Sequence, residues 1–142
     1  MGRMLLAMPP PALPADLVPL RTALERHGFQ VRLAPPPRRN VYGLFEARSR
    51  TLWIAPVAFP LGIGRPTFLH EATHAAQSCP SGTLSLIGIQ RKLDPVVSQE
   101  IRGILTTRYG HGNRAIEQEA FLVQAQPDGA QLLIDALGRR CR

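Results

Sequence analysis

The order of the predicted elements indicates an α+β fold: one helix, about three strands, and then a run of helices. Leucines recur at helical spacing between residues 16 and 27, and β-prone segments follow between residues 29 and 55. Helical patterns with start and stop signals occupy the rest of the chain. Two of the strands are close enough to form a hairpin, so we expect a sheet of about three antiparallel strands.

Length and composition predict one domain over residues 1–142. The chain is 44% hydrophobic and has no long run of charge, which excludes a wholly disordered protein. No segment approaches the ~18 apolar residues that a membrane span requires. We interpret residues 1–14 as an irregular leader and not as an export signal, because prolines interrupt its apolar run, and residues 139–142 as a basic tail. We therefore expect a cytoplasmic location.

The first part of the chain contains one helix and the strands. The helix, at residues 16–27, carries its leucines on one face. Phe29–Leu33 alternates apolar and polar side chains, as a half-buried strand does, and a proline-rich loop follows at 35–40. Val41–Glu46 and Thr51–Ala55 predict two more strands, the second rich in good strand formers.

A loop over residues 57–65 leads into the next predicted helix. Pro66 opens this helix, with Thr67 as a possible N-cap, and Pro80 lies beyond its end. Residues 83–90 are apolar and β-prone but contain a glycine, so the pattern leaves strand and buried loop as alternatives.

Three further helices are predicted in the C-terminal part. Asp94 followed by proline is a strong start signal for a helix that continues to about Arg108. Asn113 can cap a helix over residues 114–126. A last helix opens at Asp128, and Gly138 is expected to end it.

The strongest chemical signal is a His-Glu-x-x-His motif, which begins at His70 within the predicted helix after Pro66. Residues four apart lie on one helical face, so the imidazoles of His70 and His74 can bind one ion, and neutral imidazole suits zinc. Glu71 is then placed to take a proton from water and not to bind the metal. The alternative is two surface histidines beside a solvated glutamate, and we favour zinc hydrolase chemistry.

A catalytic zinc site needs a third protein ligand, and the downstream candidates are His111, Glu117 and Glu119. Both glutamates lie on the predicted helix over 114–126, where a carboxylate can face the histidine helix. Tyr109 and His111 lie on a glycine-flanked turn, and one of them could donate a hydrogen bond to a developing oxyanion. We favour the alternative that both are ordinary loop residues.

At these residues the chain resembles the gluzincins, zinc peptidases with a His-Glu-x-x-His helix and a glutamate ligand on a later helix. In many members the second motif is Glu-x-x-Ala. Matching its alanine to Ala120 implies that Glu117 is the ligand and Glu119 a neighbouring residue. The resemblance covers roughly residues 41–126. It also implies an edge strand that holds the substrate in extended form, for which Thr51–Ala55 is the candidate.

The chain departs from this family at Phe121. Many relatives carry an aspartate there, which supports a ligand histidine, so the supporting partner in this chain must come from elsewhere.

These patterns predict a small zinc metallopeptidase that acts on a peptide or protein substrate. His70, His74 and Glu117 would hold Zn²⁺, and Glu71 would be the general base for a zinc-activated water. One alternative is a regulatory or nucleic-acid-binding domain whose zinc is structural and closed by a fourth protein ligand. Another is an inactive zincin scaffold that serves protein interaction. The oligomeric state is left open.

Charge and cysteines give weaker indications. The formal charge is +7, but the arginines are scattered and lack interleaved aromatics, so we expect no specific nucleic-acid partner. Cys79 and Cys141 allow one disulfide or two free thiols. Free thiols are the expectation for a cytoplasmic protein.

Overall fold

The structure of the chain is a computed structural model that describes residues 13–108 and 113–142. Nearly all of the predicted leader and two of the candidate site residues, Tyr109 and His111, lie outside these ranges. The described residues form an α+β domain with an N-terminal helix, a three-stranded mixed sheet and four further α-helices.

The first half of the chain forms the elements that its sequence pattern predicts. A 3-10 turn, η1 (Ala15–Leu17), leads into α1 (Val18–Arg26), and the leucines of this segment are fully buried. The three strands are β1 (Gln30–Arg32), β2 (Gly43–Glu46) and β3 (Thr51–Ile54).

The sheet differs from the prediction in one strand direction. Its order is β1-β3-β2: β2 pairs with β3 in antiparallel fashion, as a hairpin, but β1 pairs with β3 in parallel. The prediction of an antiparallel sheet is therefore wrong for β1. The proline-rich connection after β1 takes the chain to the far side of the position that β3 occupies, and β2 runs there in the opposite direction. Since β3 turns back from β2 through a hairpin, it lies between the two strands and runs parallel to β1. It also follows that β3 is the central strand and β2 is an edge.

The second half is helical. A short 3-10 turn, η2 (Pro56–Ala58), precedes α2 (Gly64–Gln77), and α3 (Pro95–Arg108), α4 (Arg114–Gln124) and α5 (Gly129–Arg140) follow. Residues 83–90 adopt no regular element, which excludes the strand, but their side chains are exposed or half-buried, so the loop is not a buried one.

The predicted ends of two helices are wrong. Thr67 is not an N-cap, because α2 begins three residues earlier, at Gly64, and Pro66 is tolerated in its first turn. Gly138 does not end α5, because the helix continues to Arg140. The predicted start at Asp94 is confirmed, since its carboxylate accepts a hydrogen bond from the Val96 N–H over 2.8 Å.

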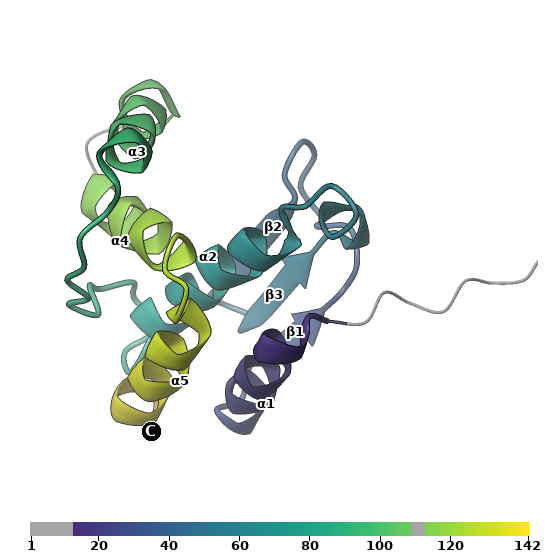
Figure 1. The fold of residues 1–142 in the computed structure, drawn as a ribbon. Helices are drawn as coiled ribbons and strands as arrows, with labels where there is room; N and C mark the ends of the chain where they lie inside the picture. Colours follow the sequence, from purple (N-terminus) through teal and green to yellow (C-terminus); the bar gives the residue numbers. More distant parts are fainter. Residues whose placement is uncertain (1–12, 109–112) are drawn as a thin grey trace, which may run out of the picture.

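Helix α2 is the centre of the fold (Figure 1). It packs against β2 and β3 on one side and against α4 and α5 on the other, whereas α3 contacts α4 at the outer end of the molecule. Three alanines of α2 are fully buried and let its neighbours approach closely: Ala72, Ala75 and Ala76. The motif helix is thus held from both sides.

The C-terminal end of α5 is fastened to the end of α2. Cys79 and Cys141 form a disulfide with a Cα–Cα distance of 5.0 Å, so the prediction of free thiols is wrong. That prediction rested on a cytoplasmic location, which itself stays a prediction, and it could not anticipate that α5 packs along α2. Arg140 reinforces the junction by donating hydrogen bonds to the carbonyl oxygens of Ala76 and Cys79 over 3.0 and 2.8 Å. Among the described helices, none is long and apolar enough to cross a membrane.

Candidate metal centre

Helices α2 and α4 bring His70, His74 and Glu117 together. The two histidines project from the same face of α2, and Glu117 projects from α4, which packs across that face. The Nε2 of His70 lies 3.0 Å from Oε1 of Glu117, and the Nε2 of His74 lies 3.2 Å from the same carboxylate. One ligand atom from each side chain lies within 4.8 Å of the others.

This arrangement fits a zinc ion. Tetrahedral zinc binds imidazole nitrogen at about 2.0–2.1 Å and carboxylate oxygen at about 2.0–2.2 Å, which places ligand atoms roughly 3.4 Å apart. The two nitrogen–oxygen distances of 3.0 and 3.2 Å are already close to this spacing. Among the described residues, no fourth His, Cys, Asp or Glu joins the group.

Two glutamines orient the histidine rings. The Nδ1–H of His74 donates to Oε1 of Gln77 over 2.7 Å, and the Nδ1–H of His70 donates to Oε1 of Gln124 over 2.7 Å. Because an amide oxygen can only accept, each ring carries a proton on Nδ1, and Nε2, which faces Glu117, is the nitrogen that a metal would bind in place of a proton. These amides take the place of the missing aspartate, and the Phe121 ring packs edge-on against His70.

Neither glutamine was predicted to be a functional residue, although the spacing of both carries a signal. Gln77 follows His70 by seven residues and His74 by three, and Gln124 follows Glu117 by seven. Each spacing returns to the same helical face, so both amides could have been placed beside the motif residues.

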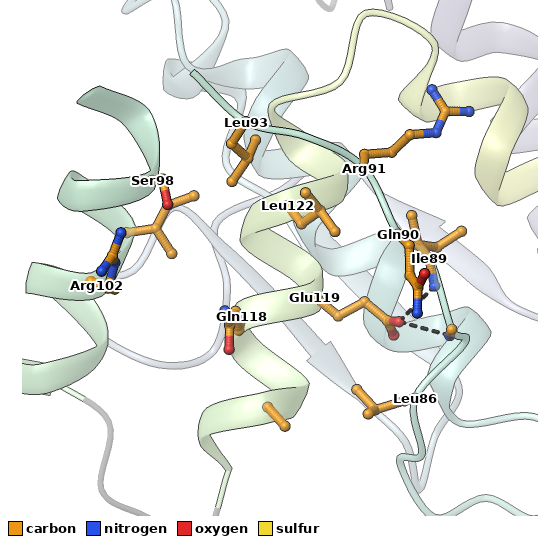
Figure 2. Close-up of a pocket in the computed structure, with 13 residues that line it drawn as sticks. Leu86, Ile89, Gln90, Arg91, Leu93, Ser98, Arg102, Gln118, Glu119 and Leu122 are labelled. Atoms are coloured by element: carbon orange, nitrogen blue, oxygen red, sulfur yellow. Dashed lines mark hydrogen bonds between the residues drawn. The ribbon is translucent and has the colours of Figure 1, made fainter. Parts of the chain in front are cut away.

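Glu119 does not face the centre. Its side chain is only 6% exposed and points to the loop after α2, where Oε1 accepts from the Ile87 N–H over 2.8 Å. Oε2 accepts from the N–H groups of Gly88 and Ile89 over 2.8 and 3.1 Å. Figure 2 shows this carboxylate at the wall of a separate pocket of about 400 Å³, formed by α3, α4 and the loop. Of the two candidate glutamates, the geometry therefore selects Glu117 for the metal group.

Glu71 lies beside the three candidate ligands without joining them. It lines the same pocket, and its carboxylate accepts a hydrogen bond from the backbone N–H of Phe45 in β2. Burial raises the pKa of Glu71 above its ordinary value, and the charges of the neighbouring histidines offset this only in part. A carboxylate with a raised pKa is a stronger base, which suits it to accept a proton.

The pKa values of two ligand candidates move in opposite directions. Burial raises the pKa of Glu117, but the hydrogen bonds of His70 and His74 outweigh it and lower the value to about 2. Burial lowers the pKa of His74, but its hydrogen bond with Glu117 outweighs that effect and raises the value. The carboxylate is therefore charged throughout the physiological range and available to a cation.

The cleft beside the centre is bounded by β2 and by the loop after α2. It has a volume of about 230 Å³, with Leu84 on the loop side and the exposed Arg38 at one wall. Strand β2, not the predicted Thr51–Ala55, forms its edge, because β3 pairs with a strand on each side. The carbonyl oxygen of Tyr42 accepts a hydrogen bond from the Ala55 N–H over 2.8 Å. Because backbone groups alternate along an antiparallel pair, Gly43 and Phe45 of β2 direct their N–H and C=O groups away from β3.

Comparison of the chain with protein-family models, with curated proteins and with solved structures gives no match. The chemistry of the centre therefore follows from its own residues and their geometry.

Proposed function

We propose that this protein is a zinc-dependent peptidase of the gluzincin type. The observation that carries the proposal is the convergence of three candidate ligand atoms, with a second carboxylate, that of Glu71, beside them but not part of the group. Three protein ligands leave a position for water or substrate, as in catalytic zinc sites, whereas structural sites are closed by four. Tyr109 and His111, which we expect to be ordinary loop residues, lie outside the described residues.

Each group of the centre has a defined task in hydrolysis. His70, His74 and Glu117 would hold a zinc ion, which when bound would supply a Lewis acid for a carbonyl group and lower the pKa of a water molecule to about 7. Glu71 takes a proton from the attacking water and returns it to the leaving amine. Gln77 and Gln124 hold the histidine rings in the tautomer that this task requires.

The free edge of β2 can align a peptide. Gly43 and Phe45 direct their backbone groups away from β3, and the Phe45 N–H is already used by Glu71. The Gly43 N–H and both carbonyl groups have no hydrogen-bond partner among the described residues. A substrate in extended form would add to this edge as a further strand, and the substrate backbone would then pass beside Glu71.

Metal content and hydrolysis test the proposal together. Purified wild-type protein should hold about one zinc per chain, and His70→Ala and His74→Ala should lose it, because two ligands hold zinc poorly. Glu71→Gln should keep the metal and lose cleavage of an unstructured protein such as casein by about 10²–10⁴-fold. Glu100→Gln, which alters an exposed glutamate of α3, is the matched control and should change neither quantity.

Two results would contradict the proposal. If the Glu71→Gln variant cleaves casein as fast as wild type does, Glu71 is not the general base. A metal content near zero in protein purified without chelator would favour the interaction scaffold over the enzyme.

A further inference from the structure

We infer that Glu119 is a positioning residue for this metal centre, which acts through Gln77 on the ring of His74. The inference deepens the proposed function and rests on it, because it assigns a role to a residue that touches neither metal nor substrate. The connection is a chain of hydrogen bonds that runs from the loop after α2 to a ligand nitrogen.

The first link is a buried carboxylate that forms no ion pair with any described residue. Glu119 is 6% exposed, and among the described residues no ion pair includes it. A buried charge is costly unless hydrogen bonds compensate for it, and here they do so completely. Three backbone N–H groups of residues 87–89 and the amide nitrogen of Gln77 occupy all four lone pairs (Figure 2 shows the side chain).

The backbone of the loop is shaped for this carboxylate. Gly88 has a φ of +95°, in the left-handed region, which turns its N–H to the same side as those of its two neighbours. A carboxylate held by three consecutive backbone groups has little freedom to move. Glu119 is therefore a fixed point from which a second side chain can be oriented.

The second link is the direction of the Gln77 amide. Its nitrogen donates to Oε1 of Glu119 over 3.0 Å and to the carbonyl oxygen of Ile116 over 3.1 Å. With both N–H bonds used, the amide oxygen must point the other way, where it accepts from the Nδ1–H of His74 over 2.7 Å. A flipped amide would place a donor against that nitrogen and would favour the tautomer that cannot bind metal through Nε2.

The other histidine lacks this second link. Gln124 accepts from His70 in the same way, but its amide nitrogen has no hydrogen-bond partner among the described residues. The direction of the Gln124 amide is thus fixed by the histidine alone. The two histidines give an internal comparison, in which only the His74 side depends on a carboxylate further away.

A double-mutant cycle on zinc affinity tests the inference. Gln77→Leu should weaken zinc binding by about 10–100-fold, the usual effect of losing the partner of a ligand histidine. Glu119→Gln should weaken zinc binding clearly when Gln77 is present and no further in the Gln77→Leu background. If the two effects are additive, Glu119 acts through general stability and the inference is wrong.

Two further variants separate positioning from folding. Gln124→Leu should weaken zinc binding too, but its effect should add to that of Glu119→Gln, because that glutamine has no contact with the carboxylate. Glu119→Asp keeps the charge but is one methylene shorter, and it should reproduce the loss of affinity even if Glu119→Gln fails to fold. Equal zinc affinity of folded Glu119→Asp and wild type would overturn the inference.

A second measurement needs no metal. In the metal-free protein, NMR can follow the exchange of the His74 Nδ1 proton with water. We expect slow exchange in wild type, fast exchange in Gln77→Leu and Glu119→Asp, and no additional change when they are combined. If wild type binds no zinc, the proposed function fails, whereas an unchanged exchange rate in Glu119→Asp contradicts the positioning role alone.

Discussion

Gly43 offers a direct test of how β2 is placed beside the candidate metal centre. A Cβ added at this position would lie 2.6 Å from Cγ2 of Thr67 and 3.0 Å from Cγ of Glu71, both on α2. Moving from 2.6 Å to the 3.4 Å at which ordinary contact begins requires a displacement of about 0.8 Å. Thr67 is β-branched, which restricts its χ1 within a helix, and Glu71 also lies in the way, so we expect the strand to move.

Gly43→Ala should therefore lower the free energy of unfolding by about 1–3 kcal/mol, the range for overpacking in a well-packed interior. It should also reduce hydrolysis, because a displaced β2 withdraws the Phe45 N–H from Glu71. Urea unfolding and casein cleavage measure the two effects.

A rescue and a control make this prediction sharper. Thr67→Ser removes the methyl group that lies closest to the added Cβ, so the double variant should recover most of the lost stability. Gly138→Ala places a Cβ where no atom lies within 4 Å, inside α5, and should raise stability by about 0.5–1 kcal/mol. If Gly43→Ala is as stable and as active as wild type, β2 does not depend on this close approach.

Three further predictions follow from the charges and the disulfide. In metal-free protein, the raised pKa of His74 contributes stability that is full below its ordinary value of 6.5 and is lost as the pH rises through the raised value. Glu117 contributes stability above 4.5 that is lost as the pH falls towards its value of about 2. A metal must displace the protons of the histidines, so the rise in Tm on adding zinc should grow as the pH increases from 4.5 to neutrality. Thermal unfolding with and without zinc across that range measures the effect. Arg38→Gln should lower kcat/KM for peptides with an acidic residue near the cleaved bond more than for neutral peptides, and the difference should shrink at high salt. Cys141→Ser should cost about 2–4 kcal/mol in urea unfolding, because the disulfide closes a loop with a separation of 62 residues.

The sequence allows most local features to be predicted, because they depend on neighbours along the chain. Helical periodicity alone predicts that the leucines of α1 share one buried face and that the two histidines of the His-Glu-x-x-His motif lie on one face of α2. Features that depend on distant contacts were not accessible. The parallel direction of β1 is set by a connection that carries no periodicity, and the Cys79–Cys141 bond depends on how α5 packs along α2.

The site shows the same division. The family resemblance favoured Glu117 over Glu119 on one alanine, and the structure supplies the physical reason. The two glutamates lie two positions apart on α4, which turns their side chains to different sides of the helix. One side faces the histidines and the other faces the backbone donors of residues 87–89, so each carboxylate has a distinct partner.

The choice of amides behind both histidines has an electrostatic consequence for the proposed chemistry. A carboxylate partner raises the basicity of a ligand imidazole and thereby donates more charge to the metal. The centre already contains two carboxylates, Glu117 and Glu71, which balance the two positive charges of a zinc ion. Neutral Gln77 and Gln124 orient the rings without adding a third negative charge beside the metal. The carboxylate of Glu119 lies behind Gln77, and four hydrogen-bond donors compensate for its charge there. Gln124→Glu should therefore hold zinc at least as tightly but acidify its water less, because the metal would be a weaker Lewis acid; Gln77 does not allow the same exchange, because its amide nitrogen donates to Glu119.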